Sequence, residues 1–353
     1  MRFLALLVSF ALVQGPLALP PTRDEFLSVF GGYIETLRIQ AGIPGMAGAI
    51  VGDTDLLWQQ AFGLRDAGAA ADPMRSDTPF QFNGLTQVVT ATMVMQCVEQ
   101  GRITLDSRIG TFTPSSPDAN ATVGQILSHT SGTPGSLTFS YNTARLDALR
   151  FVVEGCTGLT FRTAFRNTLE RLGMMDSMPG PDAAQPNLSN ADVATPAAAD
   201  RYRQLLNRLA RPFLVSAAGV PAASDFSVKT LGAANGLIST VFDFGKFDLA
   251  LKQNVLLRGD TRLAAWQNPV NASGQVLPHA MGWFVQSYNG EPVVWQFGVD
   301  ANASSSLLVT LPARGVTLIL LANSDGLAKP ASLSAGDVTV SPFAKVFLGL
   351  VVK

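Results

Sequence analysis

Charged side chains are scarce in this chain of 353 residues. Asp, Glu, Lys and Arg together make up only 14% of the sequence, against roughly a quarter in an average soluble domain. The 25 Lys and Arg residues nearly balance the 26 Asp and Glu residues, so the formal net charge is −1. A chain without a basic excess or a block of acidic residues lacks the electrostatic pattern that nucleic-acid binding requires. We therefore expect no nucleic-acid partner.

Histidine and cysteine are scarcer still: the chain has only His129 and His279, and only Cys97 and Cys156. Two histidines argue against a His-rich metal site and against most His-dependent catalytic triads. Two cysteines do not make a disulfide framework. Both lie in apolar, helix-like patterns, which favours buried thiols, although an exported protein could join them. The spacing of these residues indicates no metal, and we expect no cofactor.

The chain has one notable apolar run, at its start. Arg2 precedes an apolar stretch at 3–13, which a Gly-Pro pair then interrupts. This stretch is too short to cross a bilayer, which takes about 20 residues, and a positive residue before a short apolar stretch is typical of a secretory signal peptide. We predict a signal peptide at 1–19 and a secreted or periplasmic mature chain, with a buried N-terminal helix as the alternative. No later apolar run is long enough for a membrane span.

Hydrophobic residues make up 47% of the chain, which is enough for a sizeable core. Extended patterns occur at both ends, in one hairpin near 46–64 and in two more between 282 and 323. The middle is mostly helical in pattern, and its helix at 85–98 is apolar on nearly all sides and should be buried. Further helices are predicted at 24–41 and 341–352. These patterns predict an α/β (α+β) fold whose antiparallel sheet is built from both chain ends, with flanking helices.

The predicted sheet and the helical middle divide the chain into two lobes. We place the sheet lobe at about 20–75 and 275–353, and the mostly helical lobe at about 76–274. Because the helical lobe is inserted between the two halves of the sheet, both belong to one domain at 20–353.

Several segments, taken in order, resemble those of a known family. They are TPFQFNGLTQVVTATMVMQCVEQGRITLDSRI, VGQILSHTSGTPG, and VVWQFG followed by SSSLLVTLPARGVTLILLAN. In pattern and spacing they are similar to the serine β-lactamases and penicillin-binding-protein-like hydrolases, closest to class C β-lactamases and their esterase and D-aminopeptidase relatives. The resemblance extends over nearly the whole mature chain. It implies the β-lactamase/transpeptidase-like fold and the chemistry of a serine hydrolase.

The first catalytic motif of that family is altered here. In S-x-x-K, the Ser forms an acyl-enzyme and the Lys one helical turn later helps to remove its proton. Aligned without gaps, the Ser position is Gly84 and the Lys position is Gln87. Glycine has no nucleophile, and an amide cannot act as a base near neutral pH. If the pocket is otherwise intact, we expect the double substitution Gly84→Ser with Gln87→Lys to restore slow acylation.

The second and third motifs are altered in part. The resemblance assigns the proton-carrying tyrosine of Y-x-N to Tyr141, followed by Thr143 in place of the Asn, although a one-residue slip would put Asn142 there. The third motif, K-T-G or H-x-G in relatives, contains Gln296 and Gly298. Gln can donate a hydrogen bond but brings no positive charge for a substrate carboxylate.

Two backbone N–H groups form the oxyanion hole in this family, and these do not depend on side chains. The resemblance places them at Gly84 and Val299. Helix N-termini also attract anions through unpaired N–H groups. We therefore list Gly84, Thr143, Gln296, Gly298 and Val299 as ligand-binding residues, and expect the pocket to bind a carbonyl or carboxylate.

Other hydroxyls could replace the lost nucleophile, but none is favoured by its position. Thr86 lies about 200° around the helix from Gly84, facing away from a substrate. Ser128, Ser131 and His129 lie in one short segment, but sequence neighbours do not face one another. The resemblance gives His129 a role in holding that loop together.

The sequence thus predicts a secreted β-lactamase-related protein that has lost its catalytic residues. Such a protein would bind an acyl or peptide-like ligand, or a protein partner. The alternative is an active serine hydrolase (a β-lactamase, an esterase or a D-Ala carboxypeptidase-like enzyme) with a rerouted nucleophile. A third possibility is a scaffold protein.

Overall fold

The structure is a computed structural model that describes residues 23–68, 72–133, 136–189, 191–329 and 332–352. The described helices are α1 (Arg23–Gln40), α2 (Thr86–Glu99), α3 (Val123–Leu127), α4 (Leu149–Thr157), α5 (Phe161–Arg171), α6 (Pro196–Arg208), α7 (Val241–Lys252), α8 (Gly259–Ala265) and α9 (Pro342–Val351). The main strands are β1 (Gly45–Val51), β2 (Leu56–Asp66), β3 (Asp72–Pro73), β11 (Phe284–Tyr288), β12 (Glu291–Asp300), β13 (Ser304–Leu311) and β14 (Val316–Ala322).

Short strands pair away from the main sheet, in the helical part of the chain and beside it. They are β4 (Phe80–Gln81), β5 (Thr130–Ser131), β6 (Thr138–Phe139), β7 (Met178–Pro179), β8 (Phe213–Val215), β9 (Pro221–Ala223) and β10 (Leu237–Ser239). Two 3-10 turns matter for the site: η1 (Asn83–Leu85) before α2 and η3 (Thr143–Ala148) before α4.

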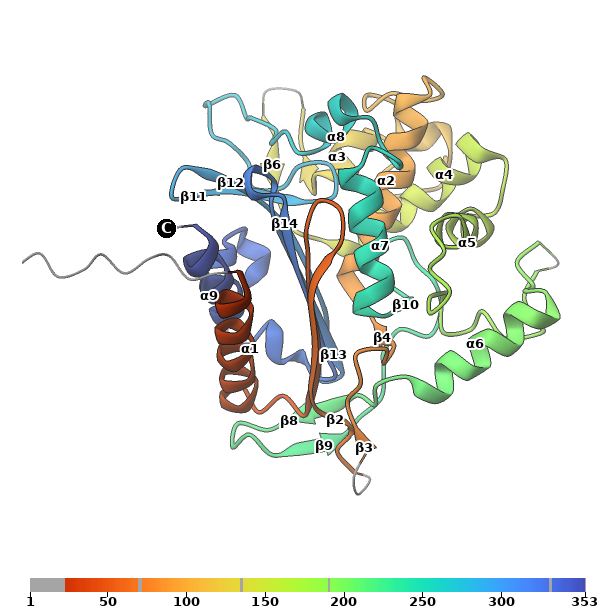
Figure 1. The fold of residues 1–353 in the computed structure, drawn as a ribbon. Helices are drawn as coiled ribbons and strands as arrows, with labels where there is room; N and C mark the ends of the chain where they lie inside the picture. Colours follow the sequence, from red (N-terminus) through yellow and green to blue (C-terminus); the bar gives the residue numbers. More distant parts are fainter. Residues whose placement is uncertain (1–22, 69–71, 134–135, 190, 330–331, 353) are drawn as a thin grey trace, which may run out of the picture.

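Within the described residues, strands from both chain ends form one sheet in the order β11-β12-β13-β14-β1-β2-β3. Every neighbouring pair is antiparallel. The two halves join where β1 pairs with β14, with Ala49 opposite Ile319. The predicted antiparallel sheet is confirmed, and Figure 1 shows it running through the molecule between two sets of helices. The division into two lobes stays a prediction.

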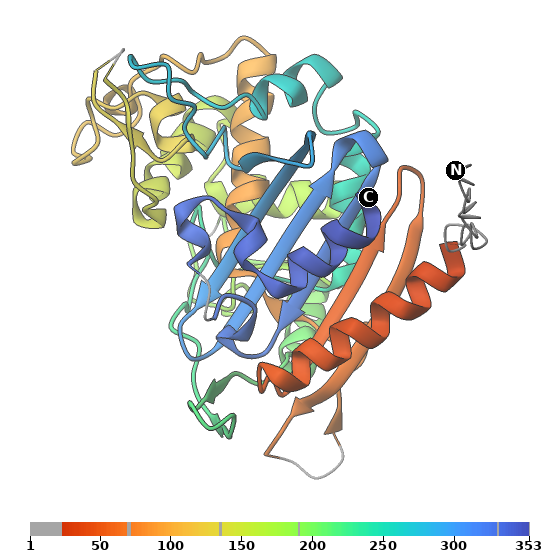
Figure 2. The ribbon, with the colours of Figure 1, turned by 90° about the vertical axis from the view of Figure 1, so that its left-hand side faces the viewer.

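Helices cover both faces of this sheet. Helices α1 and α9 lie across one face, as Figure 2 shows, while α2 and α7 lie on the other (Figure 1). Successive side chains of a strand point to opposite faces. In β14, Leu318 and Leu320 accordingly pack with the α1 and α9 side chains, and Ile319 and Leu321 with the α2 and α7 side chains. A sheet covered on both faces needs such nearly continuous apolar strands.

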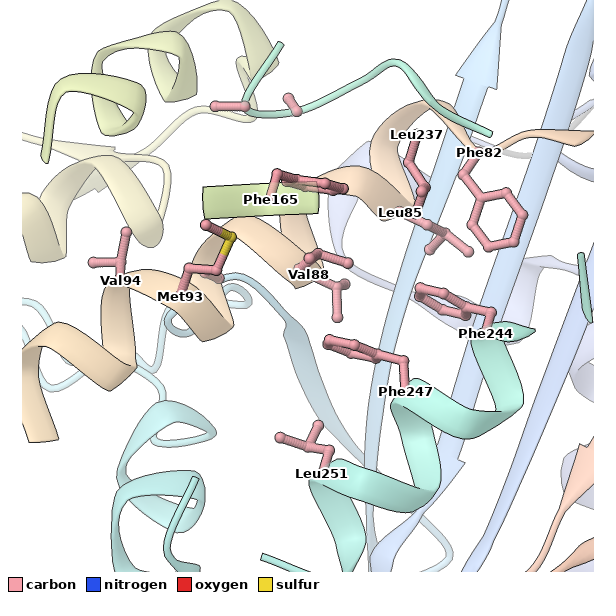
Figure 3. Close-up of a cluster of buried hydrophobic side chains, with 14 of the residues drawn as sticks. Phe82, Leu85, Val88, Met93, Val94, Phe165, Leu237, Phe244, Phe247 and Leu251 are labelled. Carbon is pink, nitrogen blue, oxygen red and sulfur yellow. The ribbon is translucent and has the colours of Figure 1, made fainter. Parts of the chain in front are cut away.

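The core between α2 and α7 fixes the start of α2. Phe82, just before η1, meets the ring of Phe244 edge-on at a centroid distance of 4.8 Å, and Phe244 stacks on Phe247. Figure 3 shows these rings against Leu85 and Val88. Every side chain on the first two turns of α2 is buried, which confirms the predicted buried helix. The site residues on η1 and α2 therefore have a rigid support.

The expectation of buried thiols was wrong. Cys97 of α2 and Cys156 of α4 form a disulfide that closes a sequence separation of 59 residues. The apolar surroundings that suggested thiols are real, since both residues lie in the hydrophobic cluster around α2. Helical periodicity in each segment could not show that the two helices pack side by side and bring the sulfur atoms together.

The predicted signal peptide at 1–19 lies outside the described residues. Within the part of the chain that the structure describes, no helix is both long enough and apolar enough to cross a bilayer.

Candidate functional site

The three altered motif segments come together around one cavity of about 220 Å³. Turn η1 supplies Gly84, the loop before η3 supplies Tyr141, the first residue of η3 is Thr143, and the end of β12 supplies Gly298 and Val299. The remaining lining residues are Asn83, Ser227, Val228, Ala234, Asn235, Phe297 and Asp300. Five of the seven predicted site residues thus line the cavity, and the other two, Gln87 and Gln296, lie in the protein behind it.

Gly84 packs directly against the backbone of β12. A β-carbon on Gly84 would lie well inside van der Waals contact of the carbonyl oxygen of Phe297 and 3.0 Å from Cα of Gly298. A β-carbon on Gly298 would in turn lie 2.5 Å from the backbone nitrogen of Gly84. Both glycines are therefore required by close approach of two backbones. A serine at residue 84 does not fit unless β12 moves.

This packing argues against the expectation that restoring both residues restores acylation. The obstacle is the carbonyl group of Phe297, which is backbone and cannot rotate away as a side chain could. Forcing a larger residue into a packed site displaces its neighbours and costs about 1–3 kcal/mol. Gly84→Ser with Gln87→Lys is accordingly expected to leave the cavity distorted rather than catalytic.

Gln87 lies at the centre of a hydrogen-bonded chain behind the cavity. The backbone N–H of Asn142 donates to Nδ1 of His129 over 3.2 Å, which leaves the imidazole proton on Nε2. Nε2 lies 3.1 Å from Oε1 of Gln87, and Nε2 of Gln87 donates to the Tyr141 hydroxyl over 2.9 Å. The amide thus bridges an imidazole and a phenol where relatives carry a lysine.

The three hydrogen-bonded side chains, those of His129, Gln87 and Tyr141, are all uncharged at neutral pH. Burial lowers the pKa of His129 to about 3. Burial also raises the pKa of the Tyr141 hydroxyl well above its ordinary value, although the hydrogen bond from Gln87 acts in the opposite direction. A neutral imidazole that already shares its proton, a protonated phenol and an amide supply no base for a nucleophile.

Gln296 faces the protein interior rather than the cavity. Its side chain is fully buried, its Nε2 lies 3.1 Å from Nε2 of His279, and its Oε1 accepts the backbone N–H of Phe297. The structure therefore does not bring Gln296 to a ligand, contrary to expectation. The neutral amide of Gln296, with its hydrogen bonds made inside the protein, occupies the position where the resemblance predicts Lys or His.

The only two histidines of the chain meet here, although 150 positions separate them. The rings of His129 and His279 lie edge to face at a centroid distance of 4.6 Å. Burial lowers the pKa of His279 well below its ordinary value, and the neighbouring His129 adds to the effect. His129 accepts the backbone N–H of Asn142 and its ring centroid lies 4.5 Å from that of Tyr141, and neither histidine ring lines the cavity.

Thr143, and not Asn142, lines the cavity. The side chain of Asn142 accepts the backbone N–H of Ala144 over 3.0 Å and thereby caps η3. An Asn at this position satisfies a free turn N–H in the way an N-cap residue does. The one-residue slip that would have given Asn142 the family role is therefore not seen.

Val299 presents its backbone at an open edge of β12. Strand β11 pairs with β12 only as far as Trp295, so the later residues of β12 have no strand on that side. The Phe297 N–H points to this side, where it bonds to Gln296, and alternation places the Val299 N–H on the same edge. One of the two predicted oxyanion-hole donors is thus well placed.

Sequence reasoning missed four polar residues of the cavity: Asn83, Ser227, Asn235 and Asp300. Asp300 is 5% exposed and accepts both the backbone N–H of Ser227 over 2.8 Å and its hydroxyl over 2.6 Å. Asn83 is 2% exposed, and its amide oxygen has no hydrogen-bond partner among the described residues. Asn83 and Asp300 each adjoin a motif residue in sequence, a signal that was available, whereas Ser227 comes from a distant loop.

The hydroxyls considered as replacement nucleophiles lie elsewhere. Thr86 is fully buried and its Oγ1 accepts the backbone N–H of Leu237, while Ser128 is buried and donates to the carbonyl of Gly124. Ser131 is exposed and pairs with Thr138. None of the three lines the cavity, whose described hydroxyls belong to Tyr141, Thr143 and Ser227. Within the described residues, no cluster of His, Cys, Asp and Glu could hold a metal ion.

Comparison with known proteins agrees with the segments quoted above. The family model described as beta-lactamase matches residues 30–337. Penicillin-binding protein 4 of Amycolatopsis lactamdurans is 36% identical over 129 residues, which cover 35% of this chain and 33% of that protein. The match thus spans about a third of the relative.

Solved structures of the same fold cover nearly the whole chain. The octameric penicillin-binding protein homologue from Pyrococcus abyssi superposes with a TM-score of 0.71 at 18% identity, over 91% of this chain and 77% of that one. The D-amino acid amidase from Ochrobactrum anthropi SV3, complexed with D-phenylalanine, gives a TM-score of 0.67 at 18% identity, over 91% and 99%. At such identities the likeness shows the fold.

Proposed function

Because this chain belongs to the beta-lactamase family, we propose that it uses the family's cleft to bind a small acyl or peptide-like ligand without cleaving it. The observation that carries this proposal is the packing of Gly84 against β12. Glycine has no side chain that could act as a nucleophile, and the backbone of β12 leaves no space for one. The cavity itself remains, and the surrounding fold supports it.

The groups behind the cavity support the non-catalytic half of the proposal. Acyl transfer in this family needs an ionisable partner that takes the proton of the nucleophile. The chain from His129 through Gln87 to Tyr141 is neutral and internally satisfied. Without a nucleophile or a base, the reaction of a bound carbonyl compound is accelerated only by its positioning and by backbone hydrogen-bond donors.

The cavity walls support the binding half. Val299 offers a backbone donor at a strand edge, and Thr143 offers a hydroxyl nearby. A volume of about 220 Å³ lies below the range of roughly 300–1,000 Å³ typical of drug-sized ligands. A ligand of amino-acid size is therefore favoured, the size class of the D-phenylalanine bound by the related amidase fold.

Export is part of the same proposal. Disulfides persist in oxidising compartments and are rare in the cytosol, and Cys97 and Cys156 are joined. The apolar stretch at the start of the chain has the pattern of a signal peptide. Together these features support a secreted or periplasmic protein.

Calorimetric titration with amides of amino-acid size, followed by chromatography of the mixture, tests the proposal. The titrants are 4-methylpentanamide, leucinamide and N-acetyl-leucinamide, each chiral compound in both enantiomers. We expect saturable binding of at least one compound and no hydrolysis product above the level in buffer. The proposal is wrong if none of the compounds binds saturably, or if any of them is hydrolysed with turnover.

A further inference from the structure

We propose that the ligand of this cavity carries a primary ammonium group beside its carbonyl group, and that the carboxylate of Asp300 binds the ammonium group. This inference rests on the proposed function and specifies the chemistry of its ligand. It also narrows the sequence-based expectation of a carbonyl or carboxylate ligand, because it excludes the carboxylate.

Asp300 is the charged group of the cavity. Among the described residues that line it, Asp300 is the only one with a charged side chain. No described Lys or Arg lies within ion-pair distance of it. A buried carboxylate without a cation is unfavourable unless it is hydrogen-bonded or meets a cation from outside. A cationic ligand supplies the missing charge.

The carboxylate is held in place but is not saturated. Ser227 donates one bond to each oxygen, through its backbone N–H to Oδ2 and through its hydroxyl to Oδ1. An ionised carboxylate can accept about four hydrogen bonds. Both oxygens therefore keep acceptor capacity, and their orientation is fixed before a ligand arrives, which lowers the cost of binding.

Asn83 lines the same cavity, and its amide oxygen is buried and has no hydrogen-bond partner among the described residues. Its Nδ2 donates to Oγ of Ser304 over 2.8 Å and lies 3.4 Å from the carbonyl oxygens of Gln81 and Ser304. These oxygens fix the orientation of the amide, so that Oδ1 is left without a partner. Buried acceptors of this kind are uncommon in native structures.

The nearby basic side chains lie off the cavity lining. Arg145 of η3 pairs with Asp118 over 3.0 Å and donates to the carbonyl of Thr130. Lys229 lies on the exposed loop after Ser227 and lines a separate cavity. The cavity at Gly84 therefore offers donors for a carbonyl oxygen at Val299 and acceptors for an ammonium group at Asp300, the pairing that an amino-acid amide or a peptide N-terminus presents.

A set of matched ligands separates the ammonium group from the rest of the molecule. Leucinamide, 4-methylpentanamide and 4-methylpentanoate share one carbon skeleton and differ in the ammonium group or in the terminal charge. A hydrogen bond to a charged group contributes enough to change affinity roughly ten- to hundredfold. We expect leucinamide to bind the wild-type chain tighter than 4-methylpentanamide by that factor, and 4-methylpentanoate to bind weakest.

Two variants test whether Asp300 causes the preference for leucinamide over 4-methylpentanamide. Asp300→Asn removes the charge and keeps an acceptor for Ser227, and Asp225→Asn removes a charge from the same loop region at an exposed residue outside this cavity. We expect the preference for leucinamide to vanish in Asp300→Asn and to persist in Asp225→Asn, with equal melting temperatures confirming that both variants fold.

The outcomes distinguish this inference from the proposed function. Equal affinity for leucinamide and 4-methylpentanamide, or tightest binding of 4-methylpentanoate, overturns the inference and leaves the binding function standing. A preference for leucinamide that survives Asp300→Asn overturns the role of Asp300, and if that variant does not fold, the wild-type ligand series still decides on the ammonium group. Absence of binding by every compound overturns the proposed function itself.

Discussion

The core between α2 and α7 and the turn at the start of α2 are adjacent, but their side chains differ in character. The α2–α7 core, formed by Val88, Phe244, Phe247 and their neighbours, is apolar and closely packed. The site turn, residues 83–87, has Gly84 and Gln87 at the positions where the resemblance predicts Ser and Lys. The core has the apolar side chains that the family fold needs, while the turn lacks, at these two positions, the hydroxyl and the amine that the resemblance leads one to expect.

This difference shows that the fold and the chemistry depend on separate residues. Packing requires hydrophobic side chains of about the right size over many positions, and each contributes about 1.5–3 kcal/mol when fully buried. Catalysis requires particular atoms at two or three positions. With Gly at residue 84 and Gln at residue 87, the first two turns of α2 are buried, and the backbone of β12 occupies the space that a side chain at residue 84 would need.

The largest expected effect comes from breaking the α2–α7 core. Phe247 is 1% exposed and packs in this core, so Phe247→Ala should lower the free energy of unfolding by about 3–5 kcal/mol. Phe242 of the same helix is 46% exposed, and Phe242→Ala is the matched control, with an expected change of about 0.5 kcal/mol or less. Urea unfolding measures both. Equal losses in the two variants would contradict the assignment of the core.

Removing the disulfide should have the next largest effect. Cys97→Ala with Cys156→Ala opens a link across 59 residues, and loss of a disulfide typically lowers stability by about 2–4 kcal/mol. Wild-type protein unfolded in the presence of a strong reductant should show a similar loss. An unchanged unfolding midpoint in both experiments would show that the two cysteines are not joined, as the sequence had suggested.

A smaller change in stability is expected at the site turn. Helix propensity alone predicts that Ala in place of Gly stabilises a helix, but here we expect a loss. Gly84→Ala should destabilise the chain by about 1–3 kcal/mol through overpacking against Phe297. Gly32, in the middle of α1, has open space around its Cα, so Gly32→Ala should stabilise by about 0.5–1 kcal/mol. Thermal and urea unfolding of Gly84→Ala and Gly32→Ala show whether each substitution lowers or raises the free energy of unfolding. A neutral or stabilising Gly84→Ala would mean that the turn and β12 are not in contact.

The last prediction concerns pH rather than a change in packing, and the dependence arises from the neutral network; its size grows with the pH interval that is compared. The pKa of His129 is about 3 in the folded chain and about 6.5 in an unfolded one. The unfolded state therefore binds more protons between these values, so stability is complete above pH 6.5 and falls as the pH decreases toward 3. The slope from this residue is about 1.4 kcal/mol per pH unit.

A variant isolates that contribution. His129→Gln has no titrating ring, so its stability should decrease less steeply between pH 6 and pH 4 than that of the wild type, although His279 and the carboxylates still contribute. Urea midpoints at half-unit intervals give the slopes. Identical slopes in the two proteins would show that His129 is not buried in its neutral form.

The sequence predicted the architecture well because the architecture depends on repeated patterns. The apolar helix before Glu99, the hairpins at both chain ends and the order of the family segments are each spread over many residues. Gly84 and Gln87 could be placed because they occupy fixed positions at the start of one helix. That catalytic groups are missing there stays a prediction.

What the sequence could not predict depends on contacts between distant segments. No local pattern shows that Cys97 meets Cys156 or that His129 meets His279, because helix packing and sheet register create both contacts. The inward orientation of Gln296 depends on the hydrogen bonds that it makes to His279 and to its neighbour Phe297. The role of Asp300 was missed because the motif ends before it, although only one residue separates it from Gly298.

The central claim, that this fold binds without forming an acyl-enzyme, is tested most directly by intact mass. The mature protein is incubated with a β-lactam and with a fluorophosphonate, beside an active serine hydrolase of the family that both reagents label. The account predicts an unchanged mass for this chain in both reactions. A stoichiometric adduct would contradict it, and peptide mapping would then show whether Ser227, Thr143 or another hydroxyl serves as the nucleophile.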